Sequence, residues 1–535
     1  MLTPIDILGE TGFISKRLEH YELRKEQLTM AEAVNRAFIE KRHLIVEAGT
    51  GVGKSFAYLV PAILQTAGNQ NDETADETAN DKSLPINVTI NNSPSEIIVT
   101  NNESSAEGES DWDMPFEYDL PEVYDDSDSP EQPDANHPAE LPRVVISTHT
   151  ISLQEQIMEK DIPFLRSVLP FEFTAVLVKG RSNYLCLRRF YSASQKLSML
   201  FGDFQQRQFE RIRDWVACTE DGSKSSLIPE PDWDIWAEIC CETGNCMGKR
   251  CKSNQKCFYN KARRRIANAQ ILIVNHALFF SDIALRMHGG GILPVYNMVV
   301  FDEAHMIAQV ASDHIGISVT QYQVEYNLYR LYNEHAHKGL LVESNINAGV
   351  DADFIDGFQS GKKNGGVGDE MIGEAREAVM DCLNRTAVFF GDLGDWFMEQ
   401  PGGNGRVRNA GIVRNLLSEG LAKLAERLRR VIEKLEISGL RQELRAVRDK
   451  IVTIRDEINS WINQSLQDES VYWIEVKMTI HGKRRVSINA VPIDVGPILR
   501  KHLFEQIPSV IMTSATLTIG QGQTRNSNSR IRNHF

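Results

Sequence analysis

The hydrophobic pattern of the chain alternates between short apolar runs and longer stretches with helical spacing. The runs at 43–47, 143–148, 271–275 and 298–302 are short and mainly apolar, which is typical of strands buried on both faces of a sheet. Helical stretches separate these runs along the chain. The alternation predicts an α/β fold, in which a mostly parallel sheet is covered by helices on both faces.

A long stretch in the second half of the chain has the spacing of amphipathic helices. From about residue 310 to residue 470, apolar residues recur every three or four positions. Strand patterns return at 471–476, 485–491 and 509–512, and 361–368 is expected to be a loop. We therefore expect a helical domain inserted into the sheet. The helical spacing is carried by Leu417, Leu421, Leu424, Leu428, Val431 and Leu435, then by Leu444, Val447, Ile451, Ile454, Ile458 and Trp461.

One segment differs from the rest in composition. Residues 67–142 are rich in Asn, Asp, Glu, Ser and Pro without apolar periodicity, so we expect a disordered acidic insertion. Between Asp72 and Glu140 lie 20 acidic residues and one basic residue, Lys82. Because the whole chain has a net charge of −15, the remainder carries about +4 and is mildly basic. A nucleic-acid partner is therefore compatible with the acidic overall composition.

The 535 residues include eight cysteines, but we find neither a secretory signal nor a membrane span. The N-terminal sequence lacks a basic region followed by a long apolar one. No run approaches the roughly 20 apolar residues that a transmembrane helix needs. These features predict a cytoplasmic protein with no membrane partner. In a reducing compartment, cysteines serve metal or thiol chemistry more often than disulfides.

The clearest motif is a glycine-rich loop between a predicted strand and a predicted helix, the context of a Walker A loop. Backbone N–H groups of such a loop surround the phosphates of ATP, Lys54 neutralises the β and γ phosphates, and the Ser55 hydroxyl binds Mg²⁺. A glycine turn that merely caps a helix is the simpler alternative. The strict Walker A pattern is missed at the first position, where alanine replaces glycine. The loop comprises Ala48, Gly49, Thr50, Gly51, Val52, Gly53, Lys54 and Ser55.

The apolar run 298–302 ends in Asp302 and Glu303, followed by Ala304 and His305. In a phosphate-loop sheet, Asp302 would hold Mg²⁺ through water, and Glu303 would orient and deprotonate the attacking water. His305 would couple the nucleotide state to the sheet. By itself the motif also fits an exposed acid pair at a strand end. With the glycine-rich loop upstream it favours ATP chemistry, which a kinase or a transporter would share.

Most of the cysteines lie between residues 186 and 265. Cys246, Cys251 and Cys257 have the spacing C-x₄-C-x₅-C, and Cys186 precedes them by sixty residues. Four thiolates hold either Zn²⁺ or an iron–sulfur cluster, and ordinary reduced cysteines are a third alternative. Eight Lys or Arg and no acidic residue lie between Cys246 and Ile266, as in a solvated face or a phosphate-contacting surface. Three further cysteines leave the ligand assignment open: Cys218, Cys240 and Cys241.

Taken together, these motifs resemble the DinG and XPD-like branch of the superfamily 2 DNA helicases. The segment 21–27 is similar to the adenine-contacting Q motif of that family, with Gln27 at the matching position. Segment 147–156 resembles motif Ia, and 513–517 resembles motif III. The remaining similar segments are 179–186 and 257–263 around cluster ligands, 274–278 after the cluster, and 471–473 with 490–495 after the Arch domain.

The resemblance implies a RecA-like first motor lobe interrupted by an iron–sulfur domain and an α-helical Arch domain. It implies a [4Fe–4S] cluster on Cys186, Cys246, Cys251 and Cys257, with ATP and Mg²⁺ at the phosphate loop. The implied activity is 5′-to-3′ translocation on single-stranded or forked DNA in repair or replication. The expected boundaries are 1–66, 143–180, 266–309 and 471–517 for the motor lobe, 67–142 for the acidic insertion, 181–265 for the iron–sulfur domain, 310–470 for the Arch and 518–535 for a polar tail.

The 18 residues of that tail lack a strand and helix pattern. We therefore expect a chain without the second motor lobe, which supplies arginine fingers in these helicases. Since such a finger contributes about 10³–10⁵ to the rate of related phosphoryl transfers, ATP hydrolysis and unwinding should be weak. Two other functions stay open: a non-hydrolysing module that binds ATP and DNA, and a zinc-stabilised phosphate-loop ATPase without helicase action.

Overall fold

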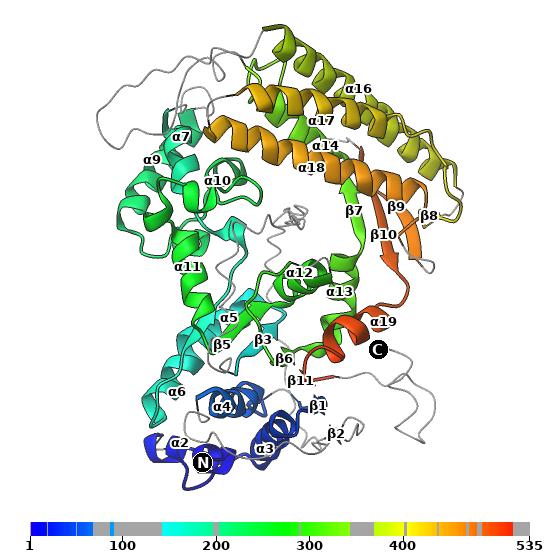
Figure 1. The fold of residues 1–535 in the computed structure, drawn as a ribbon. Coiled ribbons are helices and arrows are strands. Elements are labelled where there is room, and N and C mark those ends of the chain that lie inside the picture. Colours follow the sequence, from blue (N-terminus) through cyan, green and yellow to red (C-terminus); the bar gives the residue numbers. More distant parts are fainter. Residues whose placement is uncertain are drawn as a thin grey trace, which may run out of the picture.

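The computed structural model describes residues 2–18, 20–49, 51–67, 86–89, 142–195, 203–287, 290–342, 369–400, 404–435, 438–466, 470–478 and 484–516. Figure 1 shows three parts, which we name the sheet domain (2–178, 266–315 and 493–516), the cysteine-rich domain (179–265) and the helical domain (316–492). The sheet domain lies at the bottom of that view, the cysteine-rich domain at the left and the helical domain at the top and right. The predicted loop at 361–368 and tail at 518–535 lie outside the described residues.

The sheet domain contains a seven-stranded sheet in the order β2-β1-β11-β6-β3-β5-β4. All of its strand pairs are parallel, as predicted. The central strands β3, β6 and β11 are buried at every position, because helices cover both faces. The strands are β1 (Leu44–Glu47), β2 (Ile86–Thr89), β3 (Val144–Thr148), β4 (Ala175–Leu177), β5 (Ile271–Asn275), β6 (Met298–Asp302) and β11 (Ser509–Ser514).

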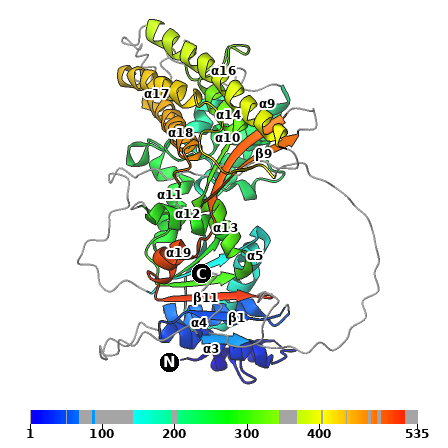
Figure 2. The same cartoon turned by 90° about the vertical axis from the view of Figure 1, so that its right-hand side faces the viewer.

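Two apolar clusters lie on opposite faces of this sheet. Alternate strand residues supply them: Val144 and Ile146 belong to one cluster, and Val145 to the other. In Figure 2, α3 and α4 lie on one side of β11, and α12, α13 and α19 lie on the other. The helices are α1 (Pro4–Leu8), α2 (Phe13–Arg17), α3 (Lys25–Ile39), α4 (Lys54–Ala67), α5 (Ile151–Gln156), α6 (Ile162–Val168), α12 (His276–Met287), α13 (Ile307–Ile315) and α19 (Gly496–Leu499).

The acidic segment 67–142 contributes one element to the sheet. Strand β2 pairs in parallel with β1, with Leu44 opposite Ile86. The expectation of disorder is therefore wrong for Ile86–Thr89, since the alternating residues of Ile-Asn-Val-Thr suit an edge strand. Apart from residues 67, 86–89 and 142, this segment lies outside the described residues.

The helical domain combines helices with an antiparallel sheet of order β7-β10-β9-β8. The predicted return to the parallel sheet at residue 471 is wrong, because β9 and β10 form a hairpin in this second sheet. Their burial alternates and suits a sheet covered on one face. The chain rejoins the parallel sheet at β11. The elements are β7 (Ile317–Thr320), α14 (Gln321–Leu331), α16 (Asp369–Glu399), β8 (Arg406–Val407), α17 (Leu417–Lys434), α18 (Ser438–Ile462), β9 (Ser470–Met478) and β10 (Arg484–Pro492).

Apolar residues of α17 and α18 pack with α14, α16 and the second sheet into one core, which confirms the predicted helical spacing. The cysteine-rich domain has a separate core that includes Phe190, Phe209 and Trp236. Its helices are α7 (Leu187–Gln195), α9 (Asp203–Cys218), α10 (Trp233–Ile239) and α11 (Phe258–Ala267). The two domains therefore bury their apolar side chains independently.

Asp161 ends a short π-helix between α5 and α6, and its side chain is buried in the sheet domain. Burial raises the pKa of Asp161 to about 6, and its Oδ2 has no hydrogen-bond partner among the described residues. The folded state therefore binds an extra proton between about pH 4 and pH 6, so stability falls as the pH rises through this interval.

We expect Asp161→Asn to stabilise the protein at pH 8, by roughly 1–3 kcal/mol, and to give no gain below about pH 4. Thermal melting at both pH values measures the difference in Tm. The matched control is Asp392→Asn on the exposed face of α16, which should leave Tm unchanged at both pH values. An equal change of Tm at pH 4 and pH 8 for Asp161→Asn would contradict the titration of this carboxyl group.

Candidate nucleotide and nucleic-acid site

The glycine-rich loop joins the end of β1 to the start of α4. Gly51 and Gly53 have φ angles of 86° and 83°, in the left-handed region that favours glycine. A Cβ atom at Gly53 would lie 2.1 Å from Gln27 Nε2, whereas none of the described atoms lies within 4 Å of one at Gly51. Ala48 is fully buried, and its N–H donates to Ser514 O at 3.0 Å. Thr50 lies outside the described residues.

Side chains from the start of α3 support this loop from outside. Gln27 Nε2 donates to Gly53 O at 2.9 Å, and the Arg24 guanidinium donates to Gly51 O. Gln27 is buried, whereas Arg24 is exposed. The residue predicted to contact adenine therefore touches the phosphate loop, and Arg24 is a contact that the sequence did not single out.

Asp302 and Glu303 lie at the carboxyl end of β6, close to the loop. Lys54 Nζ is 3.3 Å from Glu303 Oε1. Asp302 is 2% exposed, and burial raises its pKa. Glu303 has φ 55° and ψ 47°, a left-handed conformation that is rare for a residue with a side chain and that accumulates at functional sites. The structure thus brings Lys54 close to Asp302 and Glu303, which lie 248 and 249 positions later in the sequence.

His305 connects these carboxylates to β11. Its Nδ1 lies 2.9 Å from Ser514 Oγ and 3.3 Å from Glu303 Oε2. Ser514 belongs to the segment that resembles motif III, and β11 lies between β1 and β6 in the sheet. The Ser514 hydroxyl also lies 3.3 Å from Thr516 N. The predicted phosphate loop, carboxylate pair and motif III segment therefore meet at one edge of the sheet.

Two further contacts in this region were not found from the sequence. Tyr58 is fully buried on α4 and its hydroxyl donates to Asp302 Oδ2 at 3.0 Å. Ser147 Oγ lies 2.7 Å from His276 Nδ1, with both side chains buried, and burial lowers the pKa of His276 to about 4. A polar group within an otherwise apolar helix or strand is the sequence signal for both, but it does not identify the partner.

The carboxylate and hydroxyl oxygens at this edge of the sheet suit Mg²⁺, which prefers carboxylate, hydroxyl and water ligands. Asp302 is a desolvated carboxylate that already receives hydrogen bonds from Tyr58 and from Glu303 N. Ser55 lies one residue after Lys54, at the start of α4. The predicted magnesium ligands Ser55 and Asp302 therefore fit the ion by their chemistry and by their place in the fold.

The predicted cluster cysteines lie in the cysteine-rich domain. Cys186 precedes α7, Cys257 precedes α11, and Cys246 and Cys251 lie in the connecting loops, all partly buried. Burial raises the pKa values of Cys251 and Cys257, and the sulfurs of Cys186 and Cys246 raise both further. Cys251 and Cys257 are thus each influenced by Cys186 and Cys246. Within the part of the chain that the structure describes, however, no three His, Cys, Asp or Glu side chains are arranged to hold a metal ion.

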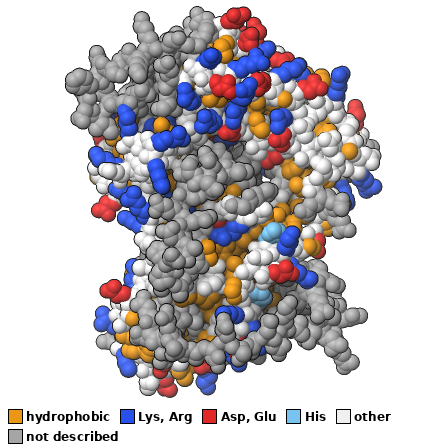
Figure 3. Space-filling model, in the orientation of Figure 1, with side chains coloured by type: hydrophobic (Ala, Val, Ile, Leu, Met, Phe, Trp, Pro, Cys, Tyr) orange, Lys and Arg blue, Asp and Glu red, His pale blue; other side chains and the backbone are white. Residues whose placement is uncertain are grey.

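The surface around these elements carries many basic side chains. Lys249, Arg250, Lys252, Lys261 and Arg264 of the predicted basic run are exposed. In Figure 3, further Lys and Arg side chains gather over the upper part of the face, where α17 and α18 lie in Figure 1. Among the helices that the structure describes, none is long and apolar enough to cross a membrane.

Comparisons with known proteins find one family model and several curated relatives. The DEAD_2 family model matches residues 239–324, which include Cys246, Cys251, Cys257 and the carboxylate pair. The ATP-dependent DNA helicase YoaA of Haemophilus influenzae is 26% identical over 321 residues, which are 60% of this chain and 38% of that protein. The ATP-dependent helicase DinG of Mycobacterium tuberculosis is 27% identical over 302 residues, which are 53% of this chain and 34% of that protein.

A third relative matches nearly the whole chain. The 3′-5′ exonuclease DinG of Bacillus subtilis is 23% identical over 537 residues, covering 96% of this chain and 48% of that protein. The chain thus spans less than half the length of each of these relatives. The similarity extends across all three domains, including the larger part of the helical domain, residues 325–492, that lies outside the DEAD_2 match.

Proposed function

We propose, from the premise that this chain is a relative of the DinG and XPD-like helicases, that it binds Mg-ATP and single-stranded DNA as part of an ATP-dependent DNA helicase. One observation carries the proposal: Lys54, Asp302 and Glu303 converge at the edge of the sheet where the glycine-rich loop begins α4. This combination of a cation, a buried carboxylate and a second carboxylate supports ATP binding and hydrolysis.

Each group has a proposed part in the reaction. Lys54 binds the β and γ phosphates, for which it exchanges its contact with Glu303. Ser55 and Asp302 would hold Mg²⁺, and the ion would supply positive charge to neutralise the phosphates. Glu303 orients and deprotonates the attacking water. Gln27, which donates to Gly53 O of the loop, would bind the adenine as the family resemblance implies. His305 relays the change at Glu303 to Ser514 on β11 through its two short contacts.

The proposed direction of movement and DNA substrate rest on the family resemblance and on the surface charge of the protein. We infer 5′-to-3′ movement on single-stranded or forked DNA, as in repair or replication. The exposed basic residues of the cysteine-rich and helical domains would contact phosphates. Such binding should weaken steeply with salt, because phosphate contacts release counterions.

Equilibrium binding on the purified chain tests this function. A fluorescent ATP analogue should bind in the presence of Mg²⁺, and single-stranded DNA should change its affinity. By linkage, the nucleotide must change the affinity for DNA by the same factor. A chain that binds DNA but no nucleotide would contradict the assignment of the glycine-rich loop. Strong binding of both without any turnover would instead support the non-hydrolysing module.

The cysteines carry a separate part of the proposal, a [4Fe–4S] cluster on Cys186, Cys246, Cys251 and Cys257. Purification without oxygen should give a brown protein with about four irons per chain. One zinc and no colour would favour the zinc-stabilised alternative. Cys382, which is buried in the helical domain, supplies a control, because Cys382→Ser should leave the metal content unchanged.

Tyr58 should influence magnesium rather than the nucleotide itself. Burial and the nearby Asp302 charge hold the pKa of Tyr58 well above its usual range, so its hydroxyl remains a donor. We expect Tyr58→Phe to raise the Mg²⁺ concentration for half-maximal nucleotide binding about tenfold, since hydrogen bonds to charged groups contribute about 1.5–3 kcal/mol. Nucleotide affinity measured in EDTA should not change.

The matched control is Tyr472→Phe in the helical domain, where the hydroxyl accepts a hydrogen bond from Leu466 N at 2.9 Å. This variant should keep the magnesium requirement of the unsubstituted chain. If both tyrosine variants shift the requirement equally, Tyr58 has no specific effect on Asp302.

A further inference from the structure

The cysteine-rich and helical domains meet through a group of charged and polar side chains and through one aromatic pair, Trp233 of α10 and Tyr326 of α14, whose ring centroids are 5.1 Å apart. Their buried apolar clusters are separate, so no continuous apolar core joins the two domains. Each domain is connected to the sheet domain by its own pair of chain crossings, near residues 178 and 266 for one and near residues 316 and 492 for the other. Because both domains are attached to the sheet domain, their contact with each other completes a ring of three domains (Figure 1).

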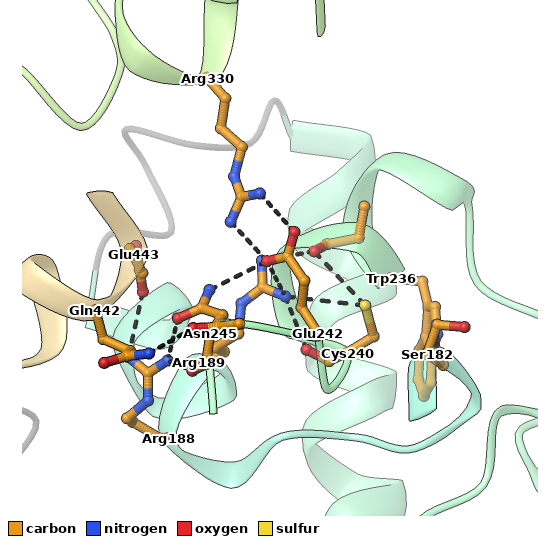
Figure 4. A network of polar contacts seen from close by, with 12 residues as sticks. Ser182, Arg188, Arg189, Trp236, Cys240, Glu242, Asn245, Arg330, Gln442 and Glu443 are labelled. Atoms are coloured by element: carbon orange, nitrogen blue, oxygen red, sulfur yellow. Dashed lines mark hydrogen bonds and ion pairs between the residues drawn. The ribbon is translucent and has the colours of Figure 1, made fainter. Parts of the chain in front are cut away.

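Glu242 lies at the centre of this contact, in the loop after α10. It is 9% exposed, and its two oxygens receive the Arg330 guanidinium of α14 at 2.7 and 2.8 Å. Lys450 Nζ of α18 donates to Glu242 Oε1 at 2.8 Å. Arg189 Nη1 of α7 lies 3.4 Å from Oε2. Figure 4 shows the Arg330 and Arg189 guanidinium groups directed at this one carboxylate from different segments of the chain.

The loop itself is held in shape by neighbouring contacts. Asn245 Nδ2 donates to Glu242 Oε2 at 3.1 Å, and Arg188 Nη2 donates to Asn245 O at 2.8 Å and to its Oδ1 at 2.6 Å. Across the interface, Arg188 Nη1 lies 3.4 Å from Glu443 Oε1, and the Gln442 amide donates to Gly244 O. These contacts lie around Glu242, but none of them brings three cations to one carboxylate as Glu242 does.

Charge makes Glu242 the critical member of the group. Burial acts to raise the pKa of Glu242, but the charges of Arg330, Arg189 and Lys450 outweigh it and hold that pKa well below its usual range. Arg189 is itself buried, and the Arg330 side chain is only 9% exposed. Without the carboxylate, three cations from the two domains would face one another in a poorly solvated space. Loss of Glu242 therefore converts an attractive contact into a repulsive one.

We propose that Glu242 is an ionic clasp that holds the cysteine-rich domain closed against the helical domain, and that removing this one carboxylate separates the two domains while each stays folded. The clasp does not depend on the proposed ATP chemistry, because none of its members lies near Lys54 or Asp302 in the fold. The clasp at Glu242 thus limits the separation between the helical domain and the cysteine-rich domain.

Distance measurements on the full chain test the clasp. Spin labels attached to ketone-bearing amino acids at Glu210 on α9 and Glu377 on α16, both exposed, leave the native cysteines untouched. In Glu242→Gln, the population at the closed distance should fall at least about tenfold, equivalent to about 1.4 kcal/mol. Glu443→Gln, which removes a carboxylate from the edge of the same interface, should keep the closed distance.

A second variant separates the clasp from a local fault in the cysteine-bearing loop. Arg330→Gln changes the helical domain alone and should open the contact in the same direction, to a smaller extent, because Lys450 and Arg189 still hold Glu242. The double variant should open no further than Glu242→Gln. A closed distance that persists in Glu242→Gln would overturn the proposal. So would opening in Glu242→Gln with none in Arg330→Gln, since that result assigns the effect to the loop.

Discussion

Glu303→Gln is expected to reduce ATP hydrolysis by roughly 10²–10⁴, the usual contribution of a positioned general base. The amide keeps the size of the side chain but cannot accept the proton of the attacking water. Nucleotide affinity should stay the same or increase, because Glu303 Oε1 is 3.3 Å from Lys54 Nζ and competes with phosphate for this cation. The expected signature is therefore lost turnover with intact or tighter binding.

Single-turnover hydrolysis with single-stranded DNA present, together with equilibrium binding, measures both halves of this signature. Glu399→Gln, at the end of α16 and far from the carboxylate pair in the chain, is a matched control and should leave both quantities unchanged. If Glu303→Gln weakens binding to the extent that it slows hydrolysis, Glu303 holds the nucleotide rather than the water.

Lys54→Ala should have the opposite effect on binding. We expect the affinity for Mg-ATP to fall about 10- to 100-fold, because charge-assisted hydrogen bonds contribute about 1.5–3 kcal/mol. Removal of this cation also leaves Glu303 Oε1 without the Lys54 ammonium, so a negative charge faces the triphosphate without that cation beside it. Titration of the fluorescent ATP analogue with Mg²⁺ gives the change directly.

The control for this variant is Lys434→Ala, which removes an exposed ammonium at the end of α17. It should bind nucleotide with unchanged affinity. Intact ATP binding in Lys54→Ala would show that the glycine-rich loop does not hold the phosphates. The double variant with Glu303→Gln should recover part of the lost affinity, since the carboxylate that faces the triphosphate is then absent.

Much of the sheet domain could be predicted because its signals are local. Strands β3, β5 and β6 are apolar runs covered on both faces, and β1 is followed at once by the glycine-rich loop. The pairing of β9 and β10 with β7 could not be predicted in this way. Ser487 of β10 lies opposite Thr320 of β7, and neither strand carries a signal for a partner so distant in sequence. The boundary error at residue 471 follows from that limit.

The same contrast between local sequence signals and long-range contacts applies to the candidate site. Lys54, Asp302 and Glu303 belong to compact motifs whose roles follow from their spacing to a strand end. The Tyr58 hydroxyl reaches Asp302 across 244 positions, through the orientation of α4 on the sheet. Glu242 likewise collects charges from α7, α14 and α18, which only the tertiary structure brings together. Long-range polar contacts therefore had to come from the structure.

The position of β11 also constrains how the protein is made. This strand separates β1 from β6, yet the hydrogen bond between Val510 N and His43 Nδ1 joins residues 467 positions apart. During synthesis, the inner edges of β1 and β6 lack their partner until the ribosome has added residues 509–514. The nascent sheet domain must therefore remain open while both other domains emerge, which exposes it to aggregation and favours chaperone binding. The strand that joins the phosphate loop to the carboxylate pair is thus also the one that completes the parallel sheet.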